Sequence, residues 1–394
     1  MTDAGSRPAP IRTDTSNAFA HNTLKVRIPA IVREVQHLNP KYPAQIQAAL
    51  DKLHDEIAGN APIPPLKLPA PDADDWAAAY AERAGETWQN TQWWFAEVYF
   101  YRLLMQTVRW WETRIDPFMS KKKEELASPL LWAMLDAALE MHGQPPEQRL
   151  PAAILQALWG NRIDLSFAPA LAHGHDWTHD DLLQADHEAA AEQILRQRGT
   201  VHIVHDNTGT ELAADLALVD AMLDAGVERV MLHLKMHPTF VSDATLKDML
   251  DMVDVMRGGQ HGPPIQGLGE RLYAAWLDGR MRYAPDLFWN SPHFLDDLPP
   301  RLEQVLAGAT LVIIKGDANY RRAVGDIIWP YDTPLSVALG GFRLPTLLLR
   351  TLKSDTLAGM PRDIGEQLDI VDAAWRVNGR RGVIQYEAGL RAED

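Results

Sequence analysis

The sequence has 394 residues, which is enough for two or three domains or for one large α/β unit with a helical addition. Hydrophobic residues make up 46% and charged residues 23%, as in ordinary water-soluble globular proteins. The net charge of −15 argues against nucleic acid or an anionic membrane surface as a general partner, and the lack of cysteine excludes disulfides, zinc–thiolate sites and thiol nucleophiles.

The N-terminal residues lack a basic region followed by an apolar run, and no apolar run in the sequence is long enough to span a bilayer. We therefore expect a cytoplasmic protein without a membrane partner. The sequence does not indicate its oligomeric state.

The first part of the chain reads as helical. Residues 1–22 are rich in Pro, Ser, Thr and Asn and are predicted to be a flexible lead-in, and residues 23–185 a helical domain. Helical patterns cover residues 43–58, 76–84, 88–105, 121–125, 129–141 and 147–158. Glu97 and Arg102 stand among the apolar residues of the aromatic helix 88–105, where charges are costly to bury unless they are paired or functional. We therefore expect the helical domain to cover a functional edge of the rest of the chain.

Residues 186–394 alternate between strands and helices. Short β-branched or leucine-rich runs predict strands at 200–205, 229–234, 309–315 and 344–350, and helical patterns cover 211–225, 244–257 and 265–278. Such alternation is typical of a mostly parallel sheet with right-handed crossovers. The predicted fold is α/β: a three-layer α/β/α sandwich over residues 186–394, plus the N-terminal helical domain.

Unusual polar residues follow all four predicted strands. They are Asp206 and Asn207 after the first, Lys235 to Asp243 after the second, Lys315 to Arg321 after the third, and Lys353 after the fourth. A parallel sheet gathers these ends at one edge, where ligands bind in open α/β folds. Each residue alone has a simpler explanation, since Asp206, Asn207 and Asp243 are also good helix caps and Lys353 could be a solvated charge.

Their joint occurrence favours a site. Carboxylate and amide oxygens suit a hard cation, and the N–H groups near Gly209 and Gly316 could face an anion. Phosphoryl transfer asks for such a combination of metal and cationic groups. Four histidines, His202, His205, His233 and His237, are interpreted as strand and turn residues. The last two have the four-residue spacing of a zinc pair, but that spacing aligns ligands on a helix, whereas here it runs from a strand into a turn.

The stretches 206–212, 240–243, 315–321 and 350–353 resemble the damage-control phosphatases, a metal-dependent family once described as acidic-residue carboxyl methyltransferases. Arg350-Thr351-Leu352-Lys353 looks like the Arg-Thr-x-Lys signature of the sugar-phosphate branch. With residues 94–102, 158–166 and 288–293, the likeness runs from about residue 88 to 359. Departures at Thr208, Ala318 and Ser354-Asp355 leave the substrate open.

The resemblance implies a phosphatase that acts on a phosphomonoester of a small metabolite, such as a sugar phosphate. It implies Mn²⁺ or Mg²⁺, with Co²⁺ or Ni²⁺ as substitutes, held by Asp206, Asn207 and Asp243. Catalytic roles would fall to Asp206, Asp243 and Lys353. Whether Asp206 attacks phosphorus or only holds metal stays open. Expected substrate contacts are Glu97, Arg102, Asn207, Asp317, Asn319, Tyr320, Arg321 and Lys353.

Two alternatives remain. A carboxyl methyltransferase would need a glycine-rich cofactor loop after an early strand, and Gly258-Gly259 and Gly340-Gly341 lie in the wrong context for one. A non-catalytic sugar-phosphate binding protein is not excluded by the sequence.

Overall fold

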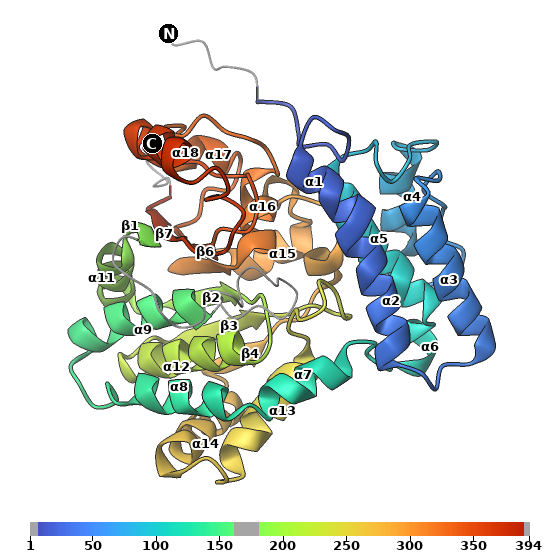
Figure 1. Ribbon diagram of the computed structural model, residues 1–394. Coiled ribbons are helices and arrows are strands. Elements are labelled where there is room, and N and C mark those ends of the chain that lie inside the picture. The colour runs from blue at the N-terminus through green and yellow to red at the C-terminus, as the bar shows by residue number, and fades with distance from the viewer. Residues whose placement is uncertain (1–6, 161–180, 390–394) are drawn as a thin grey trace.

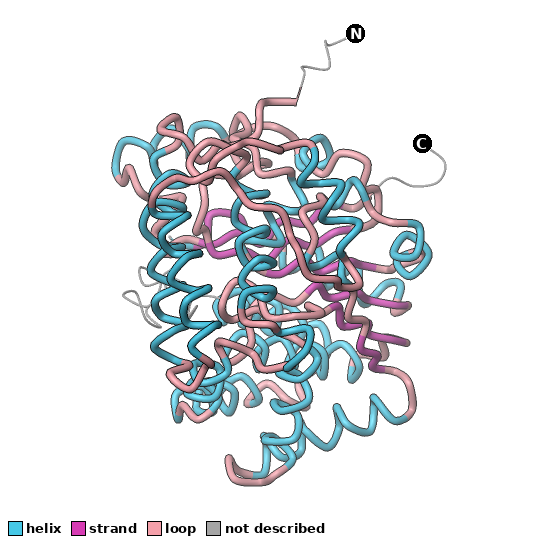
Figure 2. The backbone as a smooth tube through the Cα atoms, turned by 90° about the vertical axis from the view of Figure 1, so that its right-hand side faces the viewer, coloured by secondary structure: helices cyan, strands magenta, loops and turns pink. Residues whose placement is uncertain are grey.

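A seven-stranded sheet forms the centre of the molecule (Figures 1 and 2). The computed structural model describes residues 7–160 and 181–389. The strand order is β1-β7-β6-β5-β2-β3-β4, and the neighbouring strands are parallel except β6 and β7. The strands are Leu182–Ala185 (β1), Thr200–Val204 (β2), Arg229–His233 (β3), Met281–Tyr283 (β4), Leu311–Lys315 (β5), Thr346–Thr351 (β6) and Gly382–Glu387 (β7).

Helices cover both faces of the sheet, which confirms the predicted three-layer sandwich. Leu311 and Ile313 of β5 point into one apolar core, and Val312 and Ile314 point into the other, as the two-residue period of a strand requires. The first core is closed by α8 (Pro129–Leu139), α9 (Pro146–Gly160), α11 (His187–Gln197), α12 (Thr210–Asp224), α13 (Leu246–Arg257) and α14 (Pro263–Leu277). The second is closed by α15 (Pro300–Leu306), α16 (Asp317–Val324), α17 (Leu335–Ala338) and α18 (Arg362–Val371), with the 3₁₀ turns Leu287–Asn290 (η3) and Leu295–Asp297 (η4) beside them.

The N-terminal helices build a separate apolar core around α5, in which every residue from 93 to 105 is buried. Phe240 and Val241, from the loop after β3, belong to this core and so join the sheet to the helices. The elements are α1 (Ala18–Asn22), the π-helix η1 (Thr23–Arg27), α2 (Ile28–Leu38), α3 (Ala44–Ala58), α4 (Ala73–Ala81), α5 (Trp93–Thr107), α6 (Trp110–Thr113) and α7 (Met119–Leu126).

The structure differs from the sequence-based expectations in three places. The four predicted strands are present, but the sequence patterns do not predict β1, β4 and β7. Strands β1 and β4 have only four and three residues, which is too short for a clear pattern, whereas β7 has six. Within the expected lead-in, Ile11 is buried between the backbones of Asp326 and Trp93, and Asn17 caps α1. Helices α8 and α9, expected in the helical domain, pack on α12 beside the sheet, and the boundary at residue 185 stays a prediction. Within the described ranges, no helix is long and apolar enough to cross a bilayer.

A histidine between two carboxylates links the helical part to the rest of the molecule. His293 Nε2 lies 2.7 Å from Asp75 Oδ1 of α4, and its Nδ1 lies 2.9 Å from Asp297 Oδ2 of η4. The hydrogen bond to Asp75 raises the pKa of His293, and the nearby charges of Asp75 and Asp297 act in the same direction against partial burial. When it is protonated, the ring bridges the two parts through both carboxylates.

We expect His293→Gln to lower stability in a pH-dependent way. A pKa raised by folding contributes stability that is fully present below about pH 6.5, the usual histidine pKa, and that is lost as the pH rises through the folded-state pKa. The Tm difference between wild type and His293→Gln should thus be largest in mild acid and shrink towards alkaline pH. His54→Gln on α3 is the control, and a Tm difference independent of pH would contradict the assignment.

Candidate active site

The loops after β2 and β3 are joined by backbone hydrogen bonds at the carboxyl edge of the sheet. Asn207 and Asp243 form a β-bridge, and the N–H of Ala244 donates to the carbonyl oxygen of Asp206 over 2.7 Å. The N–H of Thr208 donates to the carbonyl of Ser242 over 2.8 Å. The parallel register of β2 and β3, which aligns Val204 with His233, brings the two loops into position.

Side-chain hydrogen bonds then fix the amide of Asn207. Its Nδ2 donates to Asp206 Oδ2 over 3.0 Å and to Glu211 Oε2 over 2.9 Å, while its Oδ1 accepts from the hydroxyl of Ser242 over 2.7 Å. Glu211 is in turn held by the buried ammonium of Lys315, 2.8 Å from its Oε1. These hydrogen bonds, and the ion pair that holds Glu211, thus set the orientation of the Asn207 amide.

Asp206, Asn207 and Asp243 line one small cavity of about 40 Å³. Lys353, from the end of β6, lies in the same wall. Eleven residues line this cavity, and they come from all four polar strand ends or loops and from the N-terminal helices: Arg27, Trp93, Glu97, Asp206, Asn207, Phe240, Asp243, Asp317, Ala318, Arg321 and Lys353. The structure therefore brings together the three expected metal ligands and the expected phosphate-binding lysine.

The donor set fits a hard divalent cation. Asp206 and Asp243 are only 5% and 1% exposed, and their carboxylates, together with the side chain of Asn207, offer oxygen atoms, which Mg²⁺ and Mn²⁺ prefer. Buried charges need nearby compensation, and Lys235 Nζ lies 3.3 Å from Asp243 Oδ2. Burial lowers the pKa of Lys235, with Arg322 adding to the shift and Asp243 opposing it. Among the described residues, no group of three or more His, Asp or Glu side chains could hold a metal ion, and the candidate donor set differs in having the amide of Asn207 as its third member.

Gly316, directly after β5, makes room for Asp206. Its φ is +81°, and a Cβ atom there would lie 1.9 Å from Asp206 Oδ2. Only glycine meets both demands, since L residues rarely adopt this φ and any side chain would displace the carboxylate. Gly316, in the polar stretch predicted after the third strand, thus leaves room for the carboxylate at the end of the neighbouring strand β2.

Arg321 and Glu97, which also line the cavity, belong to a second group of charges. Arg321 Nη1 lies 2.6 Å from Glu97 Oε2, Arg321 Nε lies 2.7 Å from Asp326 Oδ1, and the guanidinium is 3.7 Å from the ring centre of Trp93. Burial opposes the charge of Arg321, but Asp326 and Glu97 raise its pKa above the usual range. Glu97 thus reaches the site from α5, as the sequence suggested.

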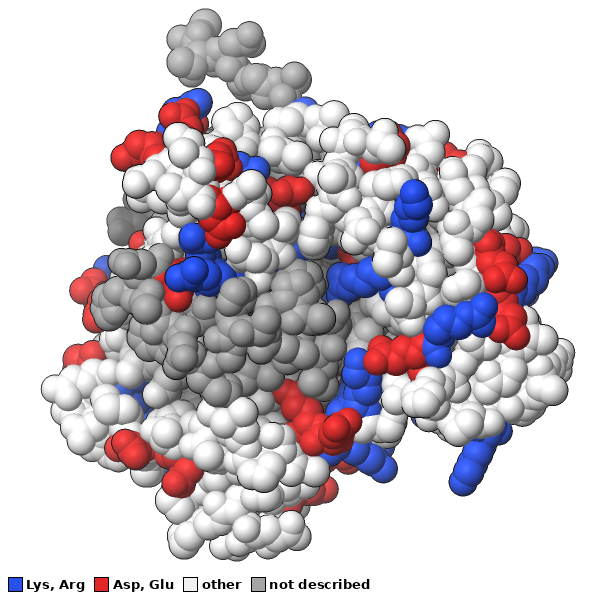
Figure 3. Space-filling view, viewed as in Figure 1, with Lys and Arg blue, Asp and Glu red and all other residues white. Residues whose placement is uncertain are grey.

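Arg27 is a site residue that sequence reasoning missed. It ends the π-helix η1, its Nη1 lies 3.7 Å from Glu97 Oε1, and its side chain is 27% exposed at the cavity. Lys and Arg side chains gather along this boundary between the N-terminal helices and the α/β part (Figure 3). No motif marks Arg27 in the sequence, and only the π-helix, a form common at functional sites, singles it out in the structure.

Asp317 holds the strand end that carries Lys353. Its Oδ1 accepts hydrogen bonds from Arg350 Nε over 2.8 Å, from the N–H of Lys353 over 2.9 Å and from the hydroxyl of Ser354 over 3.1 Å. Burial opposes ionisation of Asp317, but Arg350 and Arg321 with these hydrogen bonds lower its pKa. The carboxylate therefore positions the lysine as well as lining the cavity.

Three expected substrate contacts do not line this cavity. Arg102 forms a buried ion pair with Asp72, 2.7 Å from Nε to Oδ2, so its burial is explained by pairing inside the helical part. Asn319 donates to the carbonyl oxygens of His205 and Lys315 over 3.0 and 2.9 Å, and Tyr320 donates to Gln385 Oε1 over 3.1 Å. All three side chains bond to other parts of the protein instead of facing the cavity. A helix turns only one face towards a ligand, and on α5 and α16 that face carries other residues.

The structure also places the N–H groups near Gly209 and the four histidines. The N–H of Thr210, at the start of α12, donates to Glu125 Oε1 over 2.9 Å, so a carboxylate of α7 already occupies the helix end near Gly209. The four histidines lie outside the cavity lining, and His202 Nδ1 and His233 Nε2 lie 2.9 Å apart. Burial lowers the pKa of His202 and His237 to about 4.

Comparisons with known proteins give matches over most of this chain. A family model described as the damage-control phosphatase ARMT1-like domain matches residues 23–368. Proteins named damage-control phosphatase ARMT1 are similar over 97% of this chain and 99% of their own length, with 28% identity for Mus musculus and 27% for Homo sapiens and Macaca fascicularis. A crystal structure of a DUF89 family protein from Pyrococcus horikoshii is 14% identical; the match covers 91% of this chain and 96% of that protein's chain, with a TM-score of 0.49.

One stretch that carries the family resemblance in the sequence, residues 158–166, is only partly described by the structure, because residues 161–166 lie outside the described residues.

We expect Gly316→Ala to destabilise the protein more than Gly308→Ala does. Both glycines have positive φ, +81° and +77°, but a Cβ at Gly308 would meet nothing within 4 Å. A positive φ costs a side chain about 1–2 kcal/mol. At Gly316 the ψ of 171°, which with this φ is essentially restricted to glycine, and the displacement of Asp206 together add roughly 1–3 kcal/mol. Urea unfolding measures the difference, and equal losses for the two variants would show that the contact with Asp206 is not constraining.

Proposed function

Because this chain belongs to the damage-control phosphatase family with an ARMT1-like domain, we propose that it is a metal-dependent hydrolase of small phosphomonoesters, with sugar phosphates as its substrate class. The observation that carries the proposal is the convergence of Asp206, Asn207, Asp243 and Lys353 on one small cavity. Hydrolysis of a phosphomonoester depends chiefly on positioning and on stabilising charge at the phosphoryl oxygens, and these residue types suit both tasks.

Asp206, Asn207 and Asp243 would hold the divalent cation. When bound, that ion would supply positive charge to the phosphoryl oxygens and orient the substrate. The protein's own part is to keep the three side chains aligned, which the Asn207 hydrogen bonds to Asp206, Glu211 and Ser242 support.

Lys353 is the proposed cation for the transferring phosphoryl group. Its backbone is fixed by Asp317, and its side chain lies in the cavity wall with the carboxylates of the proposed metal site. Arg27 and Arg321 add positive charge near the cavity, and Glu97 and Asp317 offer carboxylate oxygens that can accept hydrogen bonds from sugar hydroxyls. This combination of cations and acceptors favours a phosphorylated, hydroxyl-rich substrate.

The proposal predicts phosphatase turnover that requires metal. Purified protein freed of metal by a chelator should hydrolyse p-nitrophenyl phosphate and members of a panel of phosphorylated metabolites only after Mn²⁺ or Mg²⁺ is added, with release of inorganic phosphate as the measurement. Asp243→Asn removes a ligand charge and should lower activity by at least about tenfold at fixed metal. Sugar-phosphate binding without turnover at any metal concentration would favour the non-catalytic alternative.

We expect Lys353→Ala to lower kcat/KM by roughly a hundredfold or more. A cation placed where charge develops in the transition state is worth about 2–4 kcal/mol, whereas loss of a merely solvated charge would leave the kinetics unchanged. Lys353→Arg should restore activity only in part, because a planar guanidinium does not replace a compact ammonium. Lys247→Ala, at an exposed lysine of α13, is the control. A folded Lys353→Ala protein with wild-type kcat/KM would remove this residue from the mechanism.

A further inference from the structure

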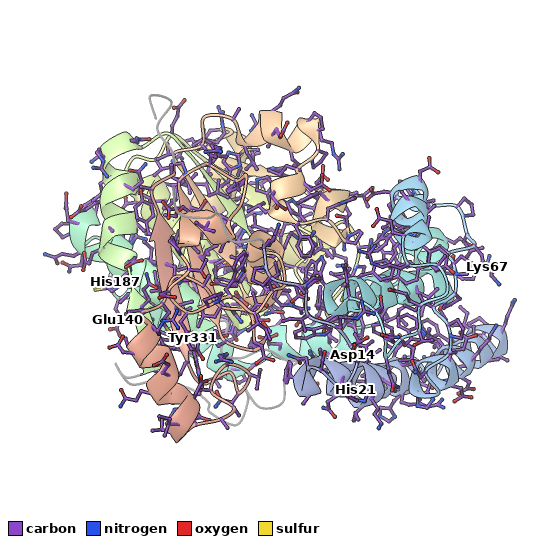
Figure 4. All side chains as sticks on the ribbon, turned by 90° about the horizontal axis from the view of Figure 1, so that it is seen from above. Asp14, His21, Lys67, Glu140, His187 and Tyr331 are labelled. Carbon is purple, nitrogen blue, oxygen red and sulfur yellow. The ribbon has the colours of Figure 1, made fainter. Side chains whose placement is uncertain are left out.

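Helix α7 lies between the N-terminal helices and the α/β part, where it leads into α8 (Figure 1). The view from above shows these two parts side by side (Figure 4). The sequence of α7, Met-Ser-Lys-Lys-Lys-Glu-Glu-Leu, has the composition of a solvated charged helix. Two of its charged residues, Lys122 and Glu125, are nevertheless buried, at 4% and 7% exposure. Residues three apart share one face of a helix, so α7 turns one cation and one anion inward.

Lys122 holds the backbone of the loop that carries Asp243. Its Nζ donates to the carbonyl oxygen of Asp243 over 3.1 Å and to Asp248 Oδ2 over 2.8 Å, and it lies 2.9 Å from Asp116 Oδ2. Asp248 also forms a capping box with Thr245 at the start of α13. These three acceptors match the three donors of an ammonium group, so Lys122 ties the Asp243 carbonyl to the first turn of α13.

Glu125 holds the loop after β2, which carries Asp206 and Asn207. Its Oε1 accepts the N–H of Thr210, the first residue of α12, and its carboxylate occupies the space where a Cβ atom of Gly209 would lie, 2.0–2.2 Å from the three carboxylate atoms. A carboxylate is stabilised at the N-terminus of a helix. Only Thr208 separates Asp206 and Asn207 from Gly209, so Glu125 fixes the turn that presents them.

The loop after β3 needs such support, because it contains backbone strain. Phe240 and Val241 have φ of +46° and +70°, a region that bulky and β-branched residues rarely adopt. Strain of this kind persists only where the surroundings hold it. The apolar core of the N-terminal helices holds Phe240 and Val241 on one side of Asp243, and Lys122 holds the carbonyl of Asp243 itself.

We propose that Lys122 and Glu125 are positioning residues that align the two loops of the proposed metal site, so that affinity for the divalent cation depends on α7. This inference rests on the proposed function. Neither side chain lines the cavity, and both act through Asp243, Asp206 and Asn207. Groups that orient metal ligands in this way commonly change metal affinity by 10- to 100-fold when they are lost.

The test measures Mn²⁺ binding directly, by the electron paramagnetic resonance signal of free Mn²⁺ during titration of the chelator-treated full-length protein. Glu125→Ala should raise the Kd for Mn²⁺ by about 10- to 100-fold. Glu125→Gln should restore part of the affinity, because its amide oxygen can still accept the N–H of Thr210. Lys121→Met is the matched control, since Lys121 lies on the same helix and pairs with Glu34 of α2, 2.9 Å away.

Lys122→Met alone would leave Asp116 and Asp248 buried without their cation, and it could fail to fold for that reason. The neutral triple variant Lys122→Met/Asp116→Asn/Asp248→Asn avoids this problem and should also bind Mn²⁺ at least about tenfold more weakly. Wild-type affinity in folded Glu125→Ala and in the triple variant overturns the role of α7 and leaves the proposed function intact. A wild-type protein that neither binds Mn²⁺ nor hydrolyses phosphomonoesters overturns both.

Discussion

Two buried carboxylates at one edge of the sheet, Asp206 and Asp243, are the constraint on which the rest of the structure depends. Burying a charge is costly unless other groups compensate for it, and two like charges on one small cavity increase that cost. The surroundings accordingly supply an ammonium group 3.3 Å from Asp243, that of Lys235, and a glycine, Gly316, whose missing side chain leaves space for Asp206. A divalent cation would complete this balance.

The charged side chains around this edge form small clusters of buried ion pairs. Lys315 lies 2.8 Å from Glu211 and 3.0 Å from Asp215, and Arg321 is held between Glu97 and Asp326. Buried ion pairs of this kind are weak sources of stability, because desolvation offsets most of their attraction. Their consequence here is geometric: each set fixes the direction of a side chain or loop that borders the cavity.

The N-terminal helices contribute to the site rather than merely standing beside it. Helix α5 supplies Glu97 and Trp93, η1 supplies Arg27, and the apolar core of these helices encloses Phe240 from the loop that carries Asp243. Rings of Trp94 and Tyr101 lie 6.3 and 5.0 Å from that of Phe240. A cavity built from both parts makes the placement of the helical part a condition for the alignment of the site.

By itself, the sequence determined the α/β layers, the four strands whose ends carry polar residues, and the grouping of Asp206, Asn207, Asp243 and Lys353. These follow from local patterns, because the period of a buried strand and the rule that parallel strands end at one edge need no tertiary information. Only the tertiary structure decided which charged side chains face the cavity. Arg102 is paired internally, Arg27 lines the wall, and Lys122 and Glu125 of α7 turn inward. The partner of a buried charge comes from a distant part of the chain that no local pattern specifies.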